Sequence, residues 1–114
     1  MKRRLIATIV IGFSLTLAGL ASAQDKAQVE RGMKVFADQT CSICHAVGGK
    51  GNVKGLLDDV GTRVKADEIR EWLANPVEMA KKAKAERKPP MKAYTQLSKE
   101  DLDALVAYLS SLKK

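Results

Sequence analysis

The sequence predicts a small all-α domain. Apolar residues recur at helical spacing in three separate segments, and glycines and prolines separate those segments. No two segments alternate as the strands of a sheet would, so we expect no strand pair. The expected domain spans residues 24–114, because residues 1–23 have the layout of a secretory signal peptide.

The N-terminal segment has the three parts of a signal peptide. A basic start at residues 2–4 precedes an uncharged run over residues 5–20, and Ala21-Ser22-Ala23 is a cleavage signature. An uncleaved membrane anchor is the alternative, although the apolar run falls short of the roughly 20 residues that a spanning helix needs. We therefore expect cleavage after Ala23 and a periplasmic protein.

Charge and size narrow the possible functions. The chain has 20 basic and 13 acidic residues, and three of the basic ones precede residue 24, so the domain keeps a net charge of +4. It has no arginine run with interleaved aromatic residues, which argues against nucleic-acid binding. A domain of 91 residues has a thin core and often needs a covalent or metal-based staple.

The first predicted helix covers residues 28–39. Its apolar stripe comprises Val29, Gly32, Met33, Phe36 and Ala37. A glycine inside a helix costs about 1 kcal/mol relative to alanine, so Gly32 indicates that another element approaches the backbone closely. Met33 is expected to belong to the core.

The next stretch, Cys41-Ser42-Ile43-Cys44-His45, carries the chemistry. The C-x-x-C-H spacing is typical of a c-type haem attachment site. Each thiol can add to one vinyl group of the porphyrin, and the adjacent imidazole can bind the iron as the proximal ligand. We therefore predict one covalently bound haem c, which would also supply the staple. Residues 50–61 are glycine-rich and should form a loop with a short turn of helix around residues 56–60.

Three other interpretations of the cysteine pair are weaker. A disulfide between Cys41 and Cys44 is possible in an oxidising compartment. A thioredoxin-type site would need βαβ patterning around the pair, which the sequence lacks. A zinc site would need a carboxylate or water to complete it, because the chain has only two cysteines and one histidine.

A second helix is predicted over residues 66–74, ending at Asn75-Pro76. Ile69, Trp72 and Leu73 share one face of it. Trp72 is either ordinary core or an indole N–H donor to a haem propionate, because a buried indole usually finds a partner.

The segment 76–88 predicts a surface helix that begins with proline and is rich in alanine and lysine. Between Glu78 and Lys92 there are six basic and two acidic residues, a local charge of +4. We expect this surface to steer the protein toward acidic partners. The lysines concerned are Lys81, Lys82, Lys84, Lys88 and Lys92.

Ser98 is predicted to begin the last helix, with Asp101 completing a capping arrangement. Its apolar stripe comprises Leu102, Leu105, Val106, Leu109 and Leu112. Tyr108 lies next to this stripe.

The sixth iron ligand is the remaining question. His45 is the only histidine, so bis-histidine ligation and a distal histidine are excluded, and methionine, lysine, water or an open position remain. Met91 follows the rigid pair Pro89-Pro90, and a stiff extended loop suits a weak thioether ligand better than Met79 in the basic helix does. Met/His ligation is an electron-transfer pairing that fills both axial positions. We therefore expect a carrier, not an enzyme, with no small-molecule substrate.

Together these residues resemble the class I cytochrome c family in its small bacterial monohaem form. The resemblance rests on the motif at residues 41–45 and on Pro89-Pro90-Met91, and it spans nearly the whole domain. It implies a fold in which the N- and C-terminal helices cross at a right angle while shorter helices and loops wrap one haem. Gly32 and Phe36 would meet the C-terminal helix at Leu105–Leu109.

The resemblance has further implications for the haem pocket. Trp72 and Tyr94 are similar to aromatic residues that line it in the family. Many members also have Gly-Pro-x-Leu after the motif, where the proline carbonyl accepts the imidazole N–H. Here the run is Gly55-Leu56-Leu57, so we expect the Leu56 carbonyl to accept.

The leading hypothesis is a monomeric periplasmic electron shuttle of a respiratory chain. Its partners would be redox proteins with acidic docking surfaces, such as a membrane-bound reductase or oxidase. A haem-based sensor or enzyme with a labile sixth ligand is one alternative. A membrane-anchored cytochrome with an uncleaved N-terminus is the other.

Overall fold

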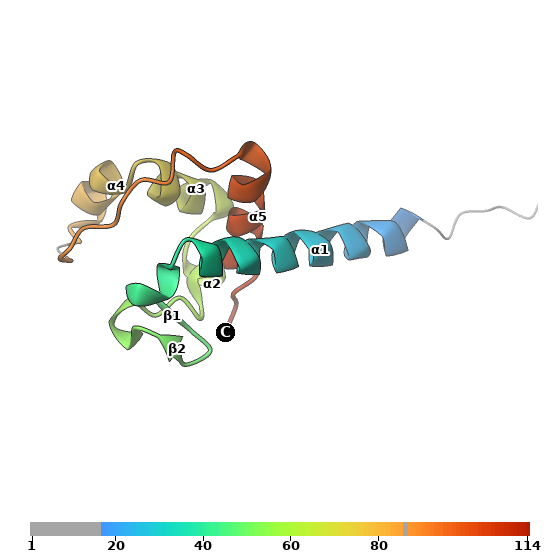
Figure 1. Ribbon diagram of the computed structural model, residues 1–114, viewed down its shortest axis with the longest axis horizontal. Coiled ribbons are helices and arrows are strands. Elements are labelled where there is room, and N and C mark those ends of the chain that lie inside the picture. Colours follow the sequence, from blue (N-terminus) through green and yellow to red (C-terminus); the bar gives the residue numbers. More distant parts are fainter. Residues whose placement is uncertain (1–16, 86) are drawn as a thin grey trace, which may run out of the picture.

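The computed structural model describes residues 17–85 and 87–114. It confirms a mostly helical domain, shown in Figure 1. The helices are α1 (Leu17–Asp38), α2 (Val60–Arg63), α3 (Ala66–Ala74), α4 (Pro76–Ala83) and α5 (Lys99–Ser110). Two 3₁₀ turns, η1 (Cys41–Ile43) and η2 (Val53–Gly55), and two short strands, β1 (Ala46–Val47) and β2 (Lys50–Gly51), lie between α1 and α2.

The crossing of α1 and α5 is the main packing contact, and Figure 1 shows the two helices passing each other steeply. A Cβ atom at Gly32 would overlap the Ala104 carbonyl oxygen and come within 2.5 Å of Tyr108 Cβ. Beside this contact, the rings of Phe36 and Tyr108 meet edge to face, with centroids 5.6 Å apart and planes at 74°. The prediction that an element approaches Gly32 closely is confirmed.

The buried face of α1 differs from the predicted stripe. Met33 is 51% exposed, whereas Val35, which was not in the stripe, is only 6% exposed. The physical reason is that α5 lies directly over Gly32, so the buried arc is centred on that residue. Val35 falls within this arc, and Met33 lies beyond its other edge. The expectation that Met33 belongs to the core was wrong.

The core is built mainly from α5 and α3. Leu105 is fully buried, and the predicted apolar stripe of α5 packs inward along its length. Ile69 and Leu73 contribute from α3, whose bounds agree with the prediction. The Asp101 backbone N–H donates to Ser98 Oγ at 3.1 Å, so the predicted N-cap of the last helix is confirmed.

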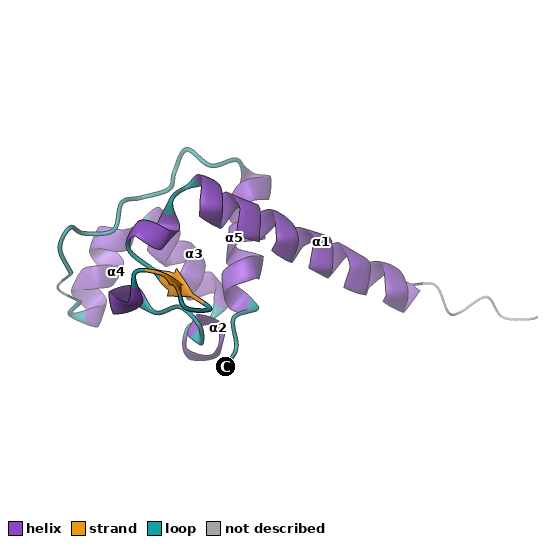
Figure 2. Cartoon of the chain, turned by 60° about the horizontal axis from the view of Figure 1, so that its bottom comes forward, coloured by secondary structure: helices purple, strands orange, loops and turns teal. Residues whose placement is uncertain are grey.

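A short antiparallel ladder contradicts the expectation of no strand pair. Ala46 pairs with Gly51 and Val47 with Lys50, and Figure 2 shows the ladder among the loops that lead away from α1. Gly48 and Gly49 connect the strands with φ of 60° and 79°, which glycine adopts at no steric cost. The sequence signal was weak because each strand has only two residues.

The first helix begins at Leu17 and not at the predicted residue 28. Two other helix boundaries differ from the predictions, each because of a backbone contact. The turn expected around residues 56–60 begins only at Val60, because the Leu57 N–H is already bonded to the Ala46 carbonyl at 3.0 Å. The basic helix ends at Ala83, not at residue 88. Lys84 adopts the left-handed conformation there, and its N–H closes the helix on the Lys81 carbonyl at 3.2 Å.

The predicted signal peptide lies mostly outside the described residues, which begin at Leu17. Ala21-Ser22-Ala23 lies within α1. Among the residues that the structure describes, no helix is both long enough and apolar enough to cross a bilayer. Cleavage after Ala23 therefore stays a prediction.

Candidate haem site

The 3₁₀ turn η1 presents the two cysteines and the histidine. Thr40, with φ of 56°, turns the chain sharply out of α1. The N–H groups of Cys44 and His45 then both bond to the Cys41 carbonyl, at 3.1 and 2.9 Å. This local winding brings three reactive side chains into one short turn. Both thiols are half-buried and free, so the disulfide alternative is not seen.

His45 is oriented by a single backbone acceptor. Its Nδ1 lies 3.1 Å from the Gly55 carbonyl oxygen. Because a carbonyl can only accept, Nδ1 must carry the proton, which leaves the Nε2 lone pair available for a metal. The acceptor is therefore the Gly55 carbonyl. The resemblance had suggested the Leu56 carbonyl, and that expectation was wrong. Leu56 instead bridges to Ala46, and this pairing sets the direction of its peptide.

The protonation state of His45 suits metal ligation. Burial lowers the pKa of the imidazole below its ordinary value, and the nearby Arg87 guanidinium lowers it further, while the Gly55 hydrogen bond opposes both. The ring is therefore neutral near pH 7, which is the form that binds iron.

Asn52 holds the motif from the loop side and was not singled out from the sequence. Its backbone N–H bonds to the carbonyls of Ser42 and His45, both at 3.1 Å. Its side-chain amide donates to the Ile43 carbonyl at 3.2 Å, and its Oδ1 accepts from the Lys54 N–H at 3.0 Å. The only available signal was an asparagine next to a glycine in a predicted loop.

Tyr94 lies at the motif, although it is far from it in the chain. Its side chain is buried beside the Cys41 thiol, and its N–H bonds to the Leu73 carbonyl at 2.8 Å. Burial raises the pKa of both Cys41 and Tyr94, and the Tyr94 hydroxyl partly offsets this for the thiol. The Lys92 ammonium sits 5.1 Å from the centroid of the Tyr94 ring.

The structure gives the burial of Met91 and Trp72, and describes fewer contacts for them than for Tyr94. Met91 is half-buried and packs against the core, next to a pocket of about 290 Å³ between its loop and the start of α4. Trp72 is half-buried but lies outside the main core cluster. The structure thus gathers Cys41, Cys44, His45 and Tyr94 at one place. The expected roles of Met91 and Trp72 stay predictions.

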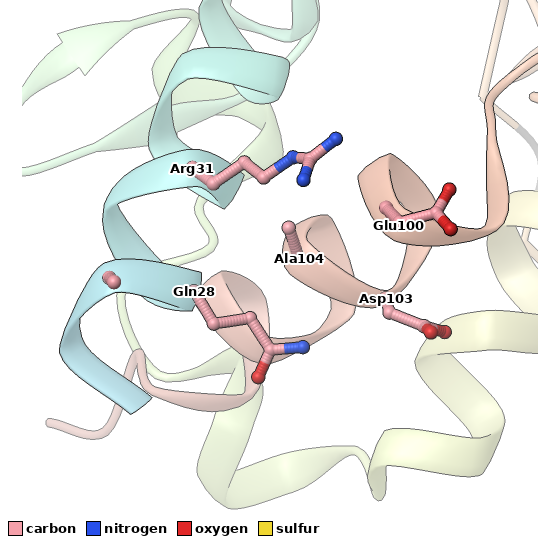
Figure 3. A pocket seen from close by; sticks show the side chains of 6 residues that line it. Gln28, Arg31, Glu100, Asp103 and Ala104 are labelled. Carbon is pink, nitrogen blue, oxygen red and sulfur yellow. The ribbon is translucent and has the colours of Figure 1, made fainter. Parts of the chain in front are cut away.

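A second pocket, of about 340 Å³, lies between α1 and α5 (Figure 3). None of the predicted haem residues lines it. Its lining residues are Ala27, Gln28, Arg31, Glu100, Asp103 and Ala104. Two ion pairs border it. An exposed pair joins Arg31 to Asp101 at 2.9 Å, and a part-buried pair joins Arg70 to Asp103 at 2.7 Å. Such pairs contribute little stability, and we assign this pocket no chemistry.

The donor set fits a c-type haem better than a simple metal ion. Two free thiols can form thioethers, and one neutral imidazole presents Nε2. Within residues 17–85 and 87–114, no cluster of three or more histidine, cysteine or acidic side chains could hold a metal ion, so the zinc alternative has no support.

Two comparisons with known proteins find a match. The family model for cytochrome c matches residues 29–113. Among curated proteins, cytochrome c oxidase subunit 2 of Alkalihalophilus pseudofirmus is 33% identical over 92 residues, which cover 73% of this chain and 25% of the relative. This chain therefore spans only about a quarter of that relative. No significant match was found among solved structures. The family match covers most of the chain, and the protein belongs to the cytochrome c family.

Proposed function

We propose that the protein carries single electrons on one haem c, bound through Cys41 and Cys44 and ligated by His45 and Met91. The observation that carries this proposal is the 3.1 Å contact between His45 Nδ1 and the Gly55 carbonyl. It fixes the tautomer in which Nε2 is free, in a ring that follows directly on the paired thiols. The haem, when bound, supplies a one-electron Fe(III)/Fe(II) couple.

The chain's own residues set the conditions for that couple. The thioethers would hold the group in place, and His45, half-buried and neutral, would supply a strong proximal ligand. A thioether from Met91 would favour the ferrous state. With His45 and Met91 both bound to the iron, no position would remain for a substrate, so the chain would act as a carrier and not as a catalyst. Tyr94, buried beside Cys41, would shield the edge of the site from water.

The partner surface has two components. Apolar side chains next to the motif face solvent, with Ile43 69%, Val53 64% and Leu56 54% exposed. The lysines of α4 and the following loop, from Lys81 to Lys92, are exposed as well. Apolar contact with a basic margin suits an acidic redox protein. The similarity to an oxidase subunit supports a partner in a respiratory chain, a membrane-bound reductase or oxidase. The protein would meet this partner as a monomer.

Salt dependence tests this partner assignment. The second-order rate of electron transfer to an acidic oxidase should fall as ionic strength rises, because screening weakens steering. A rate independent of salt would exclude steering by these lysines. The same proposal places the mature protein in the periplasm. Its intact mass should therefore correspond to a chain that begins at Gln24 and carries one covalently bound haem.

The ligation itself is tested by visible spectroscopy of the ferric protein. The wild type should show the sulfur-to-iron charge-transfer band of Met/His ligation, and Met91→Ala should lose it. Met79→Ala is the matched control and should keep the band. Ready binding of carbon monoxide by the unmodified ferrous protein would contradict the carrier and favour a sensor or enzyme with a labile sixth ligand.

A further inference from the structure

Arg87 lies beside His45, the proposed proximal ligand. In the sequence it is close to Met91, the proposed sixth ligand. A Cβ atom on Gly55 would overlap Arg87 Nη1 and the Cys44 carbonyl oxygen, and would come within 2.9 Å of His45 Nδ1. The guanidinium therefore sits against the Gly55 peptide, on the side that faces the imidazole. Gly55 has no side chain, and that gap is the space Arg87 occupies.

The contact also links His45 to the loop that carries Met91. Arg87 belongs to the segment between the end of α4 at Ala83 and Met91, and it is four residues before Met91. The loop that carries Met91, the expected sixth ligand, thus also places a cation beside His45, the expected fifth ligand. Arginine stays charged at all accessible pH values, so this charge is permanent.

We propose that Arg87 is a positioning residue for the proximal imidazole. It packs against the Gly55 peptide, holds the carbonyl toward His45 Nδ1–H, and raises the reduction potential of the haem with its charge. This inference rests on the proposed function, because it concerns the potential of the bound haem.

The direction of the effect follows from electrostatics. Oxidation adds one positive charge at the iron, and a nearby cation disfavours that charge. Arg87 is exposed, so solvent and salt screen much of the interaction. We therefore expect a moderate effect, about threefold to tenfold in the ratio of reduced to oxidised protein at a fixed solution potential. For a one-electron couple this corresponds to about 30 to 60 mV.

Spectroelectrochemical titration of the holoprotein tests the proposal. Arg87→Gln should lower the potential by the amount given above, and Arg87→Lys should recover part of it, since it keeps the charge without the planar fork. Lys26→Gln is the matched control, because it removes one charge from the half of α1 that projects away from the body (Figure 1), and it should shift the potential less. The NMR signal of His45 Nδ1–H should move in Arg87→Gln but not in Lys26→Gln.

Ionic strength provides a further check. The difference between wild type and Arg87→Gln should shrink between about 0.01 M and about 1 M salt, over which the Debye length falls from about 30 to about 3 Å. Equal shifts in Arg87→Gln and Lys26→Gln would overturn the proposal, and so would an unmoved Nδ1–H signal. Loss of the Met91 charge-transfer band in Arg87→Gln would place its effect on the sixth ligand and overturn it too. Failure of the proposed function is distinct, because the wild type itself would then lack a His/Met haem spectrum.

Discussion

The α1–α5 crossing and the motif loop, residues 40–57, are held together by different forces. At the crossing, side chains pack face to face, Leu105 is fully buried, and Gly32 lets the helices touch. In the motif loop large apolar side chains point outward, and backbone hydrogen bonds converge on His45 and Asn52. The crossing is therefore complete as a protein core, whereas the motif loop offers apolar surface that a haem and a partner can cover.

This comparison predicts that packing changes at the crossing will affect stability and leave the haem unchanged. Gly32→Leu should have the largest effect, about 3 kcal/mol of lost unfolding free energy, because the rigid Ala104 backbone must move. Denaturant unfolding of the holoprotein measures it. Met33→Leu on the exposed face is the control and should change stability by less than about 0.5 kcal/mol. If Gly32→Leu left the unfolding free energy nearly unchanged, the helices would not touch at that point.

A change in the motif loop should affect both stability and the haem. Asn52→Ala removes two side-chain hydrogen bonds and should cost about 1 to 2 kcal/mol. It should also shift the reduction potential, since Asn52 braces the turn that presents His45. Asn75→Ala, which loses one exposed hydrogen bond to Glu71, is the matched control and should leave the potential unchanged. An unchanged potential in Asn52→Ala would remove the distinction between the two regions.

The smallest expected effect is a dependence of protein stability on acidic pH, which arises from Asp103 at the rim of the α1–α5 crossing. Hydrogen bonds from Lys99 and Arg70 hold the pKa of Asp103 below its ordinary value. Because the pKa of Asp103 is lower in the folded than in the unfolded protein, its carboxylate stabilises the protein at pH values above the unfolded pKa. This stabilisation is lost as the pH falls through the pKa of the folded state. The stability difference between wild type and Asp103→Asn should therefore be constant near neutral pH and shrink below about pH 4. Urea unfolding at several pH values measures it, and a difference that grew on acidification would contradict the assignment.

Prediction from the sequence succeeded where the signal was local. The ends of α3, the Ser98 cap and the glycine contact on α1 follow from residues within one or two turns of each other. Prediction failed where a distant segment decided the outcome. Met33 was misplaced because the position of α5 over α1 selects the buried arc, and the start of α2 was misplaced because Ala46 already engages Leu57.

The same division holds for the site. The sequence by itself determined that Cys41, Cys44 and His45 lie near one another, because all three fall within five consecutive residues. Only the tertiary structure decided that Gly55 orients the imidazole, that Tyr94 covers Cys41 and that Arg87 faces His45. These contacts join residues 10 to 53 positions apart. Spacing along the chain carries no information about such pairs, since chain folding alone brings them within bonding distance.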